Sequence, residues 1–179
     1  LSNDDGTDSL FVCLDVTSEA DVISAMDKVR DEQGKLDILV NAAGIEIEKT
    51  VEETTLEEWN QSFAVNSTGT FLTSKYALPL MREAAKSDSS ASLINFGSYD
   101  GFIADPGLAA YCATKGAVHA LTRAMACDHG PEGIRVNAIC PGYIDTPMLQ
   151  SFFTGDGSGG GGKTIDQLQR AVRDVHPMR

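Results

Sequence analysis

Several features that mark particular classes of protein are missing from this sequence of 179 residues. No apolar run reaches the ~18 residues that a membrane-spanning helix needs, and no signal-peptide pattern is found. The four cysteines form no C-x-x-C pair and cluster with no histidine, which argues against a zinc site and a disulfide framework. Basic residues are scarce, since 14 Lys and Arg stand against 26 Asp and Glu, giving a net charge of -12. That charge argues against nucleic acid or an anionic membrane as a partner.

Length and composition indicate one globular domain over residues 1–179. The hydrophobic content of 42% and the charged content of 22% are ordinary for a soluble protein. The chain is long enough to bury a single core. Unpaired cysteines are typical of a reducing compartment, so we expect a cytoplasmic location and no bound metal.

Apolar runs that suit buried strands alternate along the chain with helical patterns. The expected strands are residues 10–16, 36–40, 92–96 and 134–140. Ser18 is suited to begin a helix that ends near Gly34, and Thr54 or Thr55, three residues before a glutamate, offers a capping box for another. The alternation predicts an α/β fold: a Rossmann-like, doubly wound parallel sheet with helices on both faces.

Unusual residues follow the ends of these strands, where open parallel sheets bind their ligands. They are Asp15, the segment Asn41, Ala42, Ala43 and Gly44, then Ser98, and finally Pro141 and Gly142. Each of them alone is compatible with an ordinary turn. Their placement at successive strand ends favours a ligand site, and glycines at two of the ends permit close approach of a flat cofactor.

Tyr111 and Lys115 lie four residues apart in an alanine-rich run that predicts a helix, so they share one helix face. A free phenol ionises at a pH of about 10, and a nearby cation favours the phenolate. Ser98, at the end of the third expected strand, would add a hydroxyl donor beside the phenol. The group suits proton transfer at a C=O or CH–OH group, although this spacing alone is usually just a helix face.

Asn66 is expected on an otherwise largely apolar helix stripe with Trp59, Phe63 and Thr70. One interpretation is a polar side chain bonded to nearby backbone. The other is an amide that bends the helix and holds a water in a proton path. Position alone does not decide between them.

Together, these residues resemble the short-chain dehydrogenase/reductase family, Rossmann-fold oxidoreductases that use NAD or NADP. The resemblance covers roughly residues 10–150, and twelve residues lie between Ser98 and Tyr111, a gap similar to the family's. The matching motifs, in family order, are Asp15-Val16, Asn41-Ala42-Ala43-Gly44, Asn66, Ser98, Tyr111-x3-Lys115, Arg135-Val136-Asn137-Ala138 and Pro141-Gly142-Tyr143-Ile144-Asp145-Thr146.

The resemblance implies a role for each catalytic residue. Tyr111 would be the general acid/base that serves hydride transfer between the nicotinamide and an alcohol or ketone. Ser98 would hydrogen-bond the substrate oxygen. Lys115 would lower the pKa of Tyr111 and bind the nicotinamide ribose, and Asn66 would hold a relay water.

The cofactor contacts are implied in the same way. Asp15 and Val16 would flank the adenine, and residues 41–44 would line the cofactor's inner face. The segment from Pro141 would hold the nicotinamide, and its other contact residues are Gly142, Ile144 and Thr146. NAD is favoured slightly over NADP. The full-length protein is expected to be a homodimer or homotetramer that acts on a small alcohol or ketone.

The sequence departs from the family in three places. The opening strand with its T-G-x3-G-x-G phosphate loop, the second strand that selects NAD or NADP, and the final strand are not found. In the family's strand order, 3-2-1-4-5-6-7, residues 10–16 would then lack a neighbour, and unpaired backbone is costly. We therefore expect an internal fragment of a chain of ~250 residues. Alone, it would neither fold stably nor bind cofactor tightly.

The glycine-rich residues 157–164 match the P-loop pattern G-x4-G-K-[ST]. A P-loop needs a strand running into it, and residues 150–155 make a poor buried strand. We therefore interpret residues 147–176 as a variable segment over the substrate pocket, with a flexible glycine-rich insertion that acts as a mobile lid. Two alternatives stay open: a P-loop nucleotide binder, and a non-catalytic family member that binds or regulates.

Overall fold

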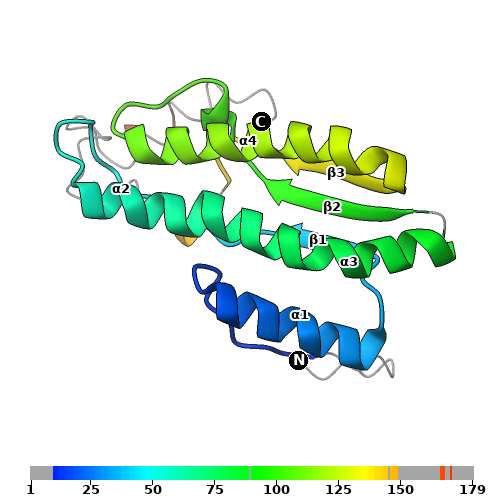
Figure 1. Ribbon diagram of the computed structural model, residues 1–179. Helices are drawn as coiled ribbons and strands as arrows, with labels where there is room; N and C mark the ends of the chain where they lie inside the picture. Colours follow the sequence, from blue (N-terminus) through cyan, green and yellow to red (C-terminus); the bar gives the residue numbers. More distant parts are fainter. Residues whose placement is uncertain (1–9, 89, 145, 149–165, 168–169, 171–179) are drawn as a thin grey trace.

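The computed structural model describes residues 10–88, 90–144, 146–148, 166–167 and 170, and the expected P-loop and most of the expected lid lie outside these residues. The described residues form a parallel sheet with helices packed on it (Figure 1). Its strand order is β1-β2-β3, with β1 at Ile38–Asn41, β2 at Ala91–Phe96 and β3 at Ile134–Ile139. The predicted α/β fold and the last three expected strands are confirmed, with ends shifted by one or two residues.

Among the elements that the structure describes from end to end, four α-helices and one π-helical segment accompany the sheet. They are α1 (Glu19–Gln33), α2 (Leu56–Phe63), the π-helical segment η1 (Ala64–Gly69), α3 (Thr70–Asp88) and α4 (Ala109–His129). Two short 3-10 turns, η2 (Tyr99–Gly101) and η3 (Gly130–Glu132), follow β2 and α4. Figure 1 shows α2, η1 and α3 as one continuous rod.

Local sequence determines where these helices begin and end. The Ser18 hydroxyl accepts the backbone N–H of Asp21 and starts α1, and Gly34 ends the helix at a φ of 71°, a left-handed conformation that glycine adopts without strain. Thr55 and Glu58 form a reciprocal capping box at the start of α2. Both predicted starts are confirmed.

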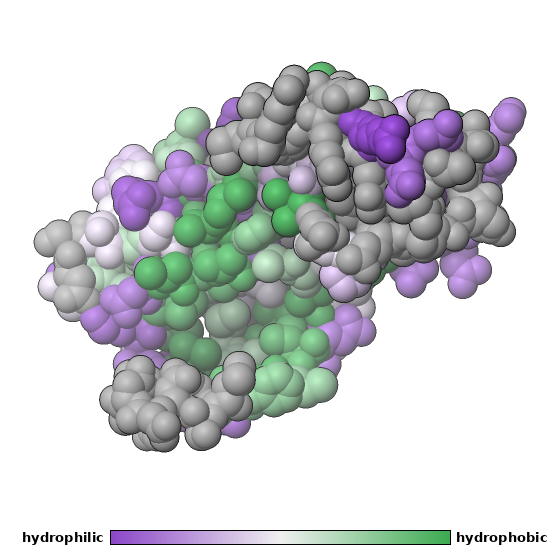
Figure 2. Space-filling model, turned by 180° about the vertical axis from the view of Figure 1, so that it is seen from behind, coloured by the Kyte–Doolittle hydropathy of each residue, from purple (hydrophilic) through white to green (hydrophobic). Residues whose placement is uncertain are grey.

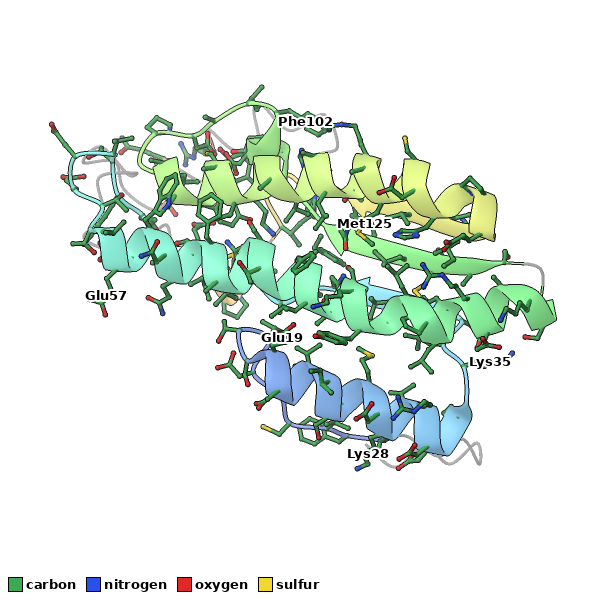
Figure 3. The ribbon with its side chains drawn as sticks, viewed as in Figure 1. Glu19, Lys28, Lys35, Glu57, Phe102 and Met125 are labelled. Carbon is green, nitrogen blue, oxygen red and sulfur yellow. The ribbon has the colours of Figure 1, made fainter. Side chains whose placement is uncertain are left out.

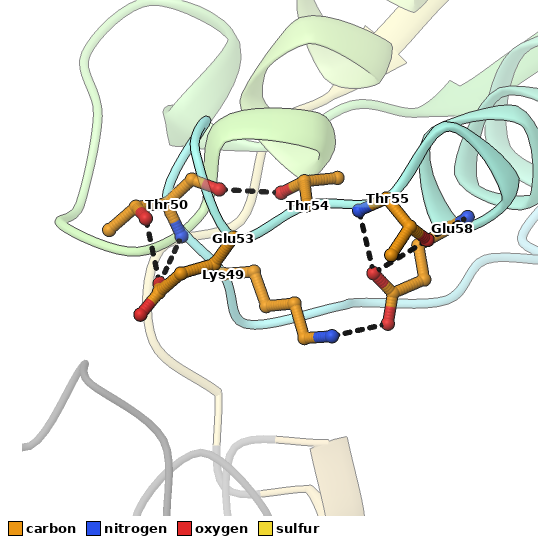
Figure 4. A network of polar contacts seen from close by, with 6 residues as sticks. All are labelled: Lys49, Thr50, Glu53, Thr54, Thr55 and Glu58. Carbon is orange, nitrogen blue, oxygen red and sulfur yellow. Dashed lines mark hydrogen bonds and ion pairs between the residues drawn. The ribbon is translucent and has the colours of Figure 1, made fainter.

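The capping box belongs to a wider polar network at the loop between β1 and α2 (Figure 4). Lys49 Nζ lies 2.6 Å from Glu58 Oε1, and the Glu53 carboxylate accepts from the backbone and the hydroxyl of Thr50. The same loop touches the start of α4, because Lys49 forms an isolated parallel bridge with Leu108. The loop is thereby held beside the helix that carries Tyr111.

One face of the sheet packs against α3 and α4. Leu39, Leu93 and Val136 are paired across the three strands and point to this face. Leu93 is fully buried, and Met125 lies between α4 and β2 (Figure 3). The buried cluster consists of Ala77, Met81, Ala84, Ala91, Leu93, Met125, Ile134 and Val136. The described core is therefore a layer between two helices and three strands.

The opposite face of the sheet is apolar and largely open in the described part of the chain. Ile38 and Val40 are 60% and 49% exposed, and Ile139 is 48% exposed. Figure 2, seen from behind Figure 1, shows hydrophobic side chains gathered across this side of the molecule around a hollow. Parallel sheets are normally covered on both faces.

The strand expected at residues 10–16 is not formed, and that prediction was wrong. The segment is assigned to no strand, and Phe11 within it is 87% exposed. A strand forms only where its backbone pairs with that of a neighbouring strand. Among the described residues, no strand lies beside this segment. The apolar pattern indicates that the segment suits a buried strand, but a strand also needs a neighbouring strand to pair with.

Candidate active site

A cavity of about 410 Å³ lies beyond the carboxyl ends of the strands. The loop after β1, the end of β2 with η2, the first turns of α4 and the loop after β3 all contribute to its wall. It brings together nine of the residues singled out from the sequence: Ala42, Gly44, Ser98, Tyr111, Lys115, Pro141, Gly142, Ile144 and Thr146. The carboxyl edge of the sheet, where the sequence predicts a ligand site, therefore contains a cavity.

Ser98 is fixed by polar contacts on both sides. Its hydroxyl accepts the backbone N–H of Asp100 at 3.1 Å and donates to the Asp100 carboxylate at 3.2 Å. Its own backbone N–H donates to His119 Nε2 at 3.3 Å. Ser98 is only 5% exposed, so its position is set by the protein interior rather than by solvent.

His119, which the sequence did not single out, explains the two glycines that flank this serine. A Cβ at Gly97 would lie 2.3 Å from the His119 ring, and one at Gly101 would lie 2.2 Å from it. Any side chain at either position would therefore displace the ring. Two glycines so close to an expected site serine were a usable signal that a bulky group packs beneath it.

Tyr111 and Lys115 occupy one face of α4, as their spacing predicts. Both are buried, at 9% and 5% exposure, and the ammonium lies 5.4 Å from the centroid of the tyrosine ring. Lys115 Nζ also donates to the backbone oxygen of Phe96 at 2.8 Å. This bond ties α4 to the end of β2 and gives the buried ammonium a partner.

The pKa of Tyr111 departs from the expectation that the lysine lowers it. Burial raises the pKa of this phenol to about 12, the Ser98 hydroxyl opposes the rise, and the charges of Glu46 and Asp100 add to it. Burial likewise lowers the pKa of Lys115. Desolvation of the phenolate is thus the largest influence on this pKa in the chain by itself.

Asn66 lies in η1 and is 1% exposed. Its side-chain oxygen accepts the backbone N–H of Ile45 at 2.8 Å, and its amide nitrogen donates to the Ile45 carbonyl and to Thr114 Oγ1. The interpretation as a side chain bonded to backbone is confirmed, although the backbone belongs to a distant loop. The helix is also distorted at this residue, and the relay water stays a prediction.

The other expected cofactor residues do not line the cavity. The Asp15 carboxylate accepts from the backbone and the hydroxyl of Thr17, which lowers its pKa, and Val16 packs against Gly69. Ala43 is exposed outside the cavity wall. The predicted contacts of Asp15 and Val16 with the adenine therefore stay a prediction.

Asn41 points into the protein interior instead of the cavity. Its amide nitrogen donates to Ser74 Oγ at 3.0 Å and to Asn95 Oδ1 at 2.9 Å, and its oxygen accepts from Thr73 Oγ1. Asn95 in turn donates to Thr122 Oγ1. This buried network joins β1 and β2 to α3 and α4, so the side chain positions the segment after β1.

The cavity also contains acidic and aromatic residues that sequence reasoning missed. Asp105 Oδ2 accepts hydrogen bonds from the hydroxyls of Tyr99 and Tyr143, whose rings lie 5.3 Å apart. Glu46 and Asp100 complete the acidic wall. Tyr143 lies inside the expected nicotinamide motif and Tyr99 follows Ser98, so their positions were a signal, whereas the distant aspartate was not.

No group of three or more His, Cys, Asp or Glu side chains among the described residues is arranged to hold a metal ion. No helix in the part of the chain that the structure describes is long and apolar enough to cross a membrane.

A serine, a tyrosine and a lysine thus meet at the carboxyl edge of a parallel sheet, and comparisons with known proteins identify the family. The family model for short chain dehydrogenases matches residues 1–157. "Inactive 2-(S)-hydroxypropyl-CoM dehydrogenase 2" of Xanthobacter autotrophicus is 47% identical over 130 residues, 73% of this chain and 55% of that protein. Cyclopentanol dehydrogenase of Comamonas testosteroni is 43% identical over 140 residues, 78% of this chain and 54% of its own.

Solved structures agree. The chain is similar to ElxO with NADP bound, with a TM-score of 0.76, 32% identity, and coverage of 92% of this chain and 62% of that one. It is also similar to the 3-ketoacyl-(acyl-carrier-protein) reductase of Brucella melitensis complexed with NADH, with a TM-score of 0.73, 31% identity, and coverage of 93% and 70%.

The chain belongs to the short-chain dehydrogenase family. It spans about half the length of the curated relatives it matches, with 55% and 54% of those two proteins covered.

Proposed function

We propose that the protein is an NAD(P)-dependent oxidoreductase that transfers a hydride between a nicotinamide cofactor and an alcohol or ketone. One observation carries this proposal: Ser98, Tyr111 and Lys115 meet at a single cavity, each of them buried and supported by its own contacts. Family membership and the dehydrogenase names of the relatives support it.

Ser98, Tyr111 and Lys115 have separate roles in the proton transfer. The Ser98 hydroxyl binds the substrate oxygen, and Tyr111 Oη takes up or returns its proton. Lys115, held by the Phe96 carbonyl, keeps a positive charge beside the phenol. Because burial raises the Tyr111 pKa to about 12, the phenol of the chain alone stays protonated at neutral pH. It is thus ready to donate, and further positive charge is needed before it accepts.

The residues around the cavity fit a nicotinamide cofactor. Lys115 supplies a buried ammonium for a ribose hydroxyl, while Pro141, Gly142, Ile144 and Thr146 supply a largely apolar lining with one hydroxyl. When bound, the cofactor accepts or donates the hydride, and its oxidised form adds a positive charge. The named ligands NADP and NADH of the two similar structures support either cofactor, and we favour NAD.

Replacing the tyrosine hydroxyl tests the proposal. Tyr111→Phe in the whole protein is expected to lower kcat by ~10²–10⁴-fold, the contribution of a positioned acid/base. Tyr76→Phe is the matched control, because the Tyr76 hydroxyl bonds to Glu19 on the surface, outside the cavity. Turnover is followed by nicotinamide absorbance and cofactor affinity by calorimetry. Turnover by Tyr111→Phe close to that of the control would overturn the assignment.

A non-catalytic binding or regulatory protein is the second candidate. The word "inactive" in the name of the 47% identical relative favours it, as does the high pKa of Tyr111. Against it, the serine, the tyrosine and the lysine are all present. The two candidates separate cleanly, because a binder takes up the cofactor without oxidising any alcohol.

The proposed assembly follows from the family resemblance, and the proposed location follows from the unpaired cysteines. We propose a homodimer or homotetramer of the whole protein in the cytoplasm. Sedimentation of the purified whole protein measures the first, and cell fractionation measures the second.

A further inference from the structure

The cavity wall is more acidic than the proposed reaction requires. Glu46, Asp100 and Asp105 all line it, and Lys115 is the one basic side chain among its described lining residues. That ammonium is already bonded to the Phe96 carbonyl. A bound molecule therefore meets three carboxyl groups and one ammonium among these lining residues, so acidic side chains outnumber basic ones.

The three carboxylates differ in their engagement. Asp100 accepts from the Ser98 hydroxyl and from the backbone N–H of Asp105, and Asp105 accepts from two phenols. No hydrogen bond joins the Glu46 carboxylate to any described residue. Its charge is thus the one least compensated by its surroundings.

The environment of Glu46 confirms that its charge is poorly stabilised. Burial raises its pKa to about 7, and the charges of Glu48, Asp100 and Asp105 add to the rise, while Lys115 opposes it. The same carboxylate acts on the reacting group, because Glu46 is among the charges that raise the pKa of Tyr111. The charge of Glu46 therefore acts on both Tyr111 and Lys115.

We propose that this cavity selects an uncharged alcohol or ketone over one that carries a carboxylate, sulfonate or phosphate, and that Glu46 sets this preference. The inference deepens the proposed function and rests on it. Like charges facing one another in a partly buried site repel strongly. An uncharged substrate instead meets the apolar wall of Phe96, Leu108 and Ile144.

Two substrates of equal size make the test. In the whole protein with NAD or NADP, kcat/KM is measured for 4-hydroxycyclohexanecarboxamide and for 4-hydroxycyclohexanecarboxylate. We expect the carboxamide to be preferred by ~10-fold or more, the usual scale of like-charge discrimination. Equal values, or a preference for the carboxylate, would overturn the proposal.

The variant Glu46→Gln removes the charge and keeps the shape. It is expected to reduce the preference for the carboxamide at least threefold, chiefly through KM for the carboxylate, by the same electrostatic reasoning. Glu57→Gln is the control, because Glu57 lies on the exposed first turn of α2, away from the cavity (Figure 3). An unchanged ratio in Glu46→Gln would remove Glu46 from the proposal.

A pH series tests the same residue without mutation, in case the variant fails to fold. Between about pH 6 and about pH 8, Glu46 passes from mostly protonated to mostly ionised, while the probe carboxylate stays ionised throughout. The charges of Glu48, Asp100, Asp105 and Lys115 act on Glu46, whose own pKa of about 7 lies in this window. The preference for the carboxamide is expected to grow with pH. A flat or falling ratio contradicts the proposal.

Calorimetry separates this proposal from the proposed function. If neither alcohol is oxidised, the oxidoreductase assignment fails. The binding of the two corresponding ketones, the 4-oxo carboxamide and the 4-oxo carboxylate, still reports the selectivity. Tighter binding of the carboxamide supports the inference in that case, and tighter or equal binding of the carboxylate overturns it.

Discussion

The two faces of the sheet are built by neighbouring residues of the same strands, yet they differ in what covers them. Leu93 points to α3 and α4 and is fully buried, whereas Val40, on the opposite face, is 49% exposed. Both faces carry apolar side chains, so the presence of apolar residues does not by itself distinguish them. The difference teaches that an apolar strand pattern describes what a face can bury, and that only packing elements in reach decide whether it does.

The largest expected effect contrasts these two residues directly. Leu93→Ala should lower the free energy of unfolding of the whole protein by about 2–5 kcal/mol, because it leaves a cavity in the packed layer. Val40→Ala should lower it by less than about 1 kcal/mol if this face stays open in the whole protein, since half of that side chain meets solvent among the described residues. Urea denaturation measures both. Equal losses would show that the open face is covered in the whole protein by residues beyond those described.

A second contrast uses polar residues. Asn95→Ala should destabilise the whole protein by about 1–3 kcal/mol, because it removes bonds from the buried Asn41 and Thr122 side chains. Asn137→Ala is the control, because Asn137 is exposed on β3 and should change stability by less than about 0.5 kcal/mol. Similar losses for both variants would contradict the division of the sheet into a packed and an open face.

The helix that leads into the packed layer provides a smaller effect. Thr55→Ala removes the side-chain oxygen that caps α2 and should lower the free energy of unfolding by about 1 kcal/mol. Thr55→Ser keeps that oxygen and should restore most of the loss. Thermal unfolding of the three proteins measures the series. A serine variant as unstable as the alanine variant would show that the cap is not what stabilises this end.

The smallest effect is the pH dependence of stability that comes from Glu46, at the carboxyl edge of the sheet. The folded state raises the pKa of Glu46 from 4.5 to about 7, so the folded protein holds this proton more tightly than the unfolded chain. Its contribution favours folding below pH 4.5 and is lost as pH rises to about 7. Glu46→Gln should therefore be more stable than the parent above pH ~7, by on the order of 1 kcal/mol after solvent screening, and no more stable at pH ~4. Equal stability of the two proteins at pH ~8 would contradict the raised pKa.

Sequence predicted what depends on neighbours along the chain. Ser18, Gly34 and Thr55 act within one turn of their helices, and the spacing of Tyr111 and Lys115 is itself a helical property. These positions were therefore found correctly. The sheet edge was also predicted, because the carboxyl ends of parallel strands meet at one edge.

Features that need distant partners were missed. His119 approaches Ser98 only once α4 lies under β2, and Asp105 meets Tyr143 across 38 positions of the chain. The segment at 10–16 failed as a strand for the converse reason, since its pattern presupposes a partner. The pKa of Tyr111 follows the same rule, because its burial is a tertiary property.

The π-helical segment η1 determines how α2 is rotated relative to α3 about the axis that the two helices share. A π-helical turn holds an extra residue, and one residue advances an α-helix by about 100°. Deleting one residue between Ala64 and Gly69 would restore regular geometry but turn α2 by that angle relative to α3. Asn66 would then leave Ile45 and Thr114, and the loop after β1 would lose the link to α4 that Asn66 provides. A single-residue insertion or deletion in this stretch is therefore expected to disturb the structure more than the substitution of an exposed residue there.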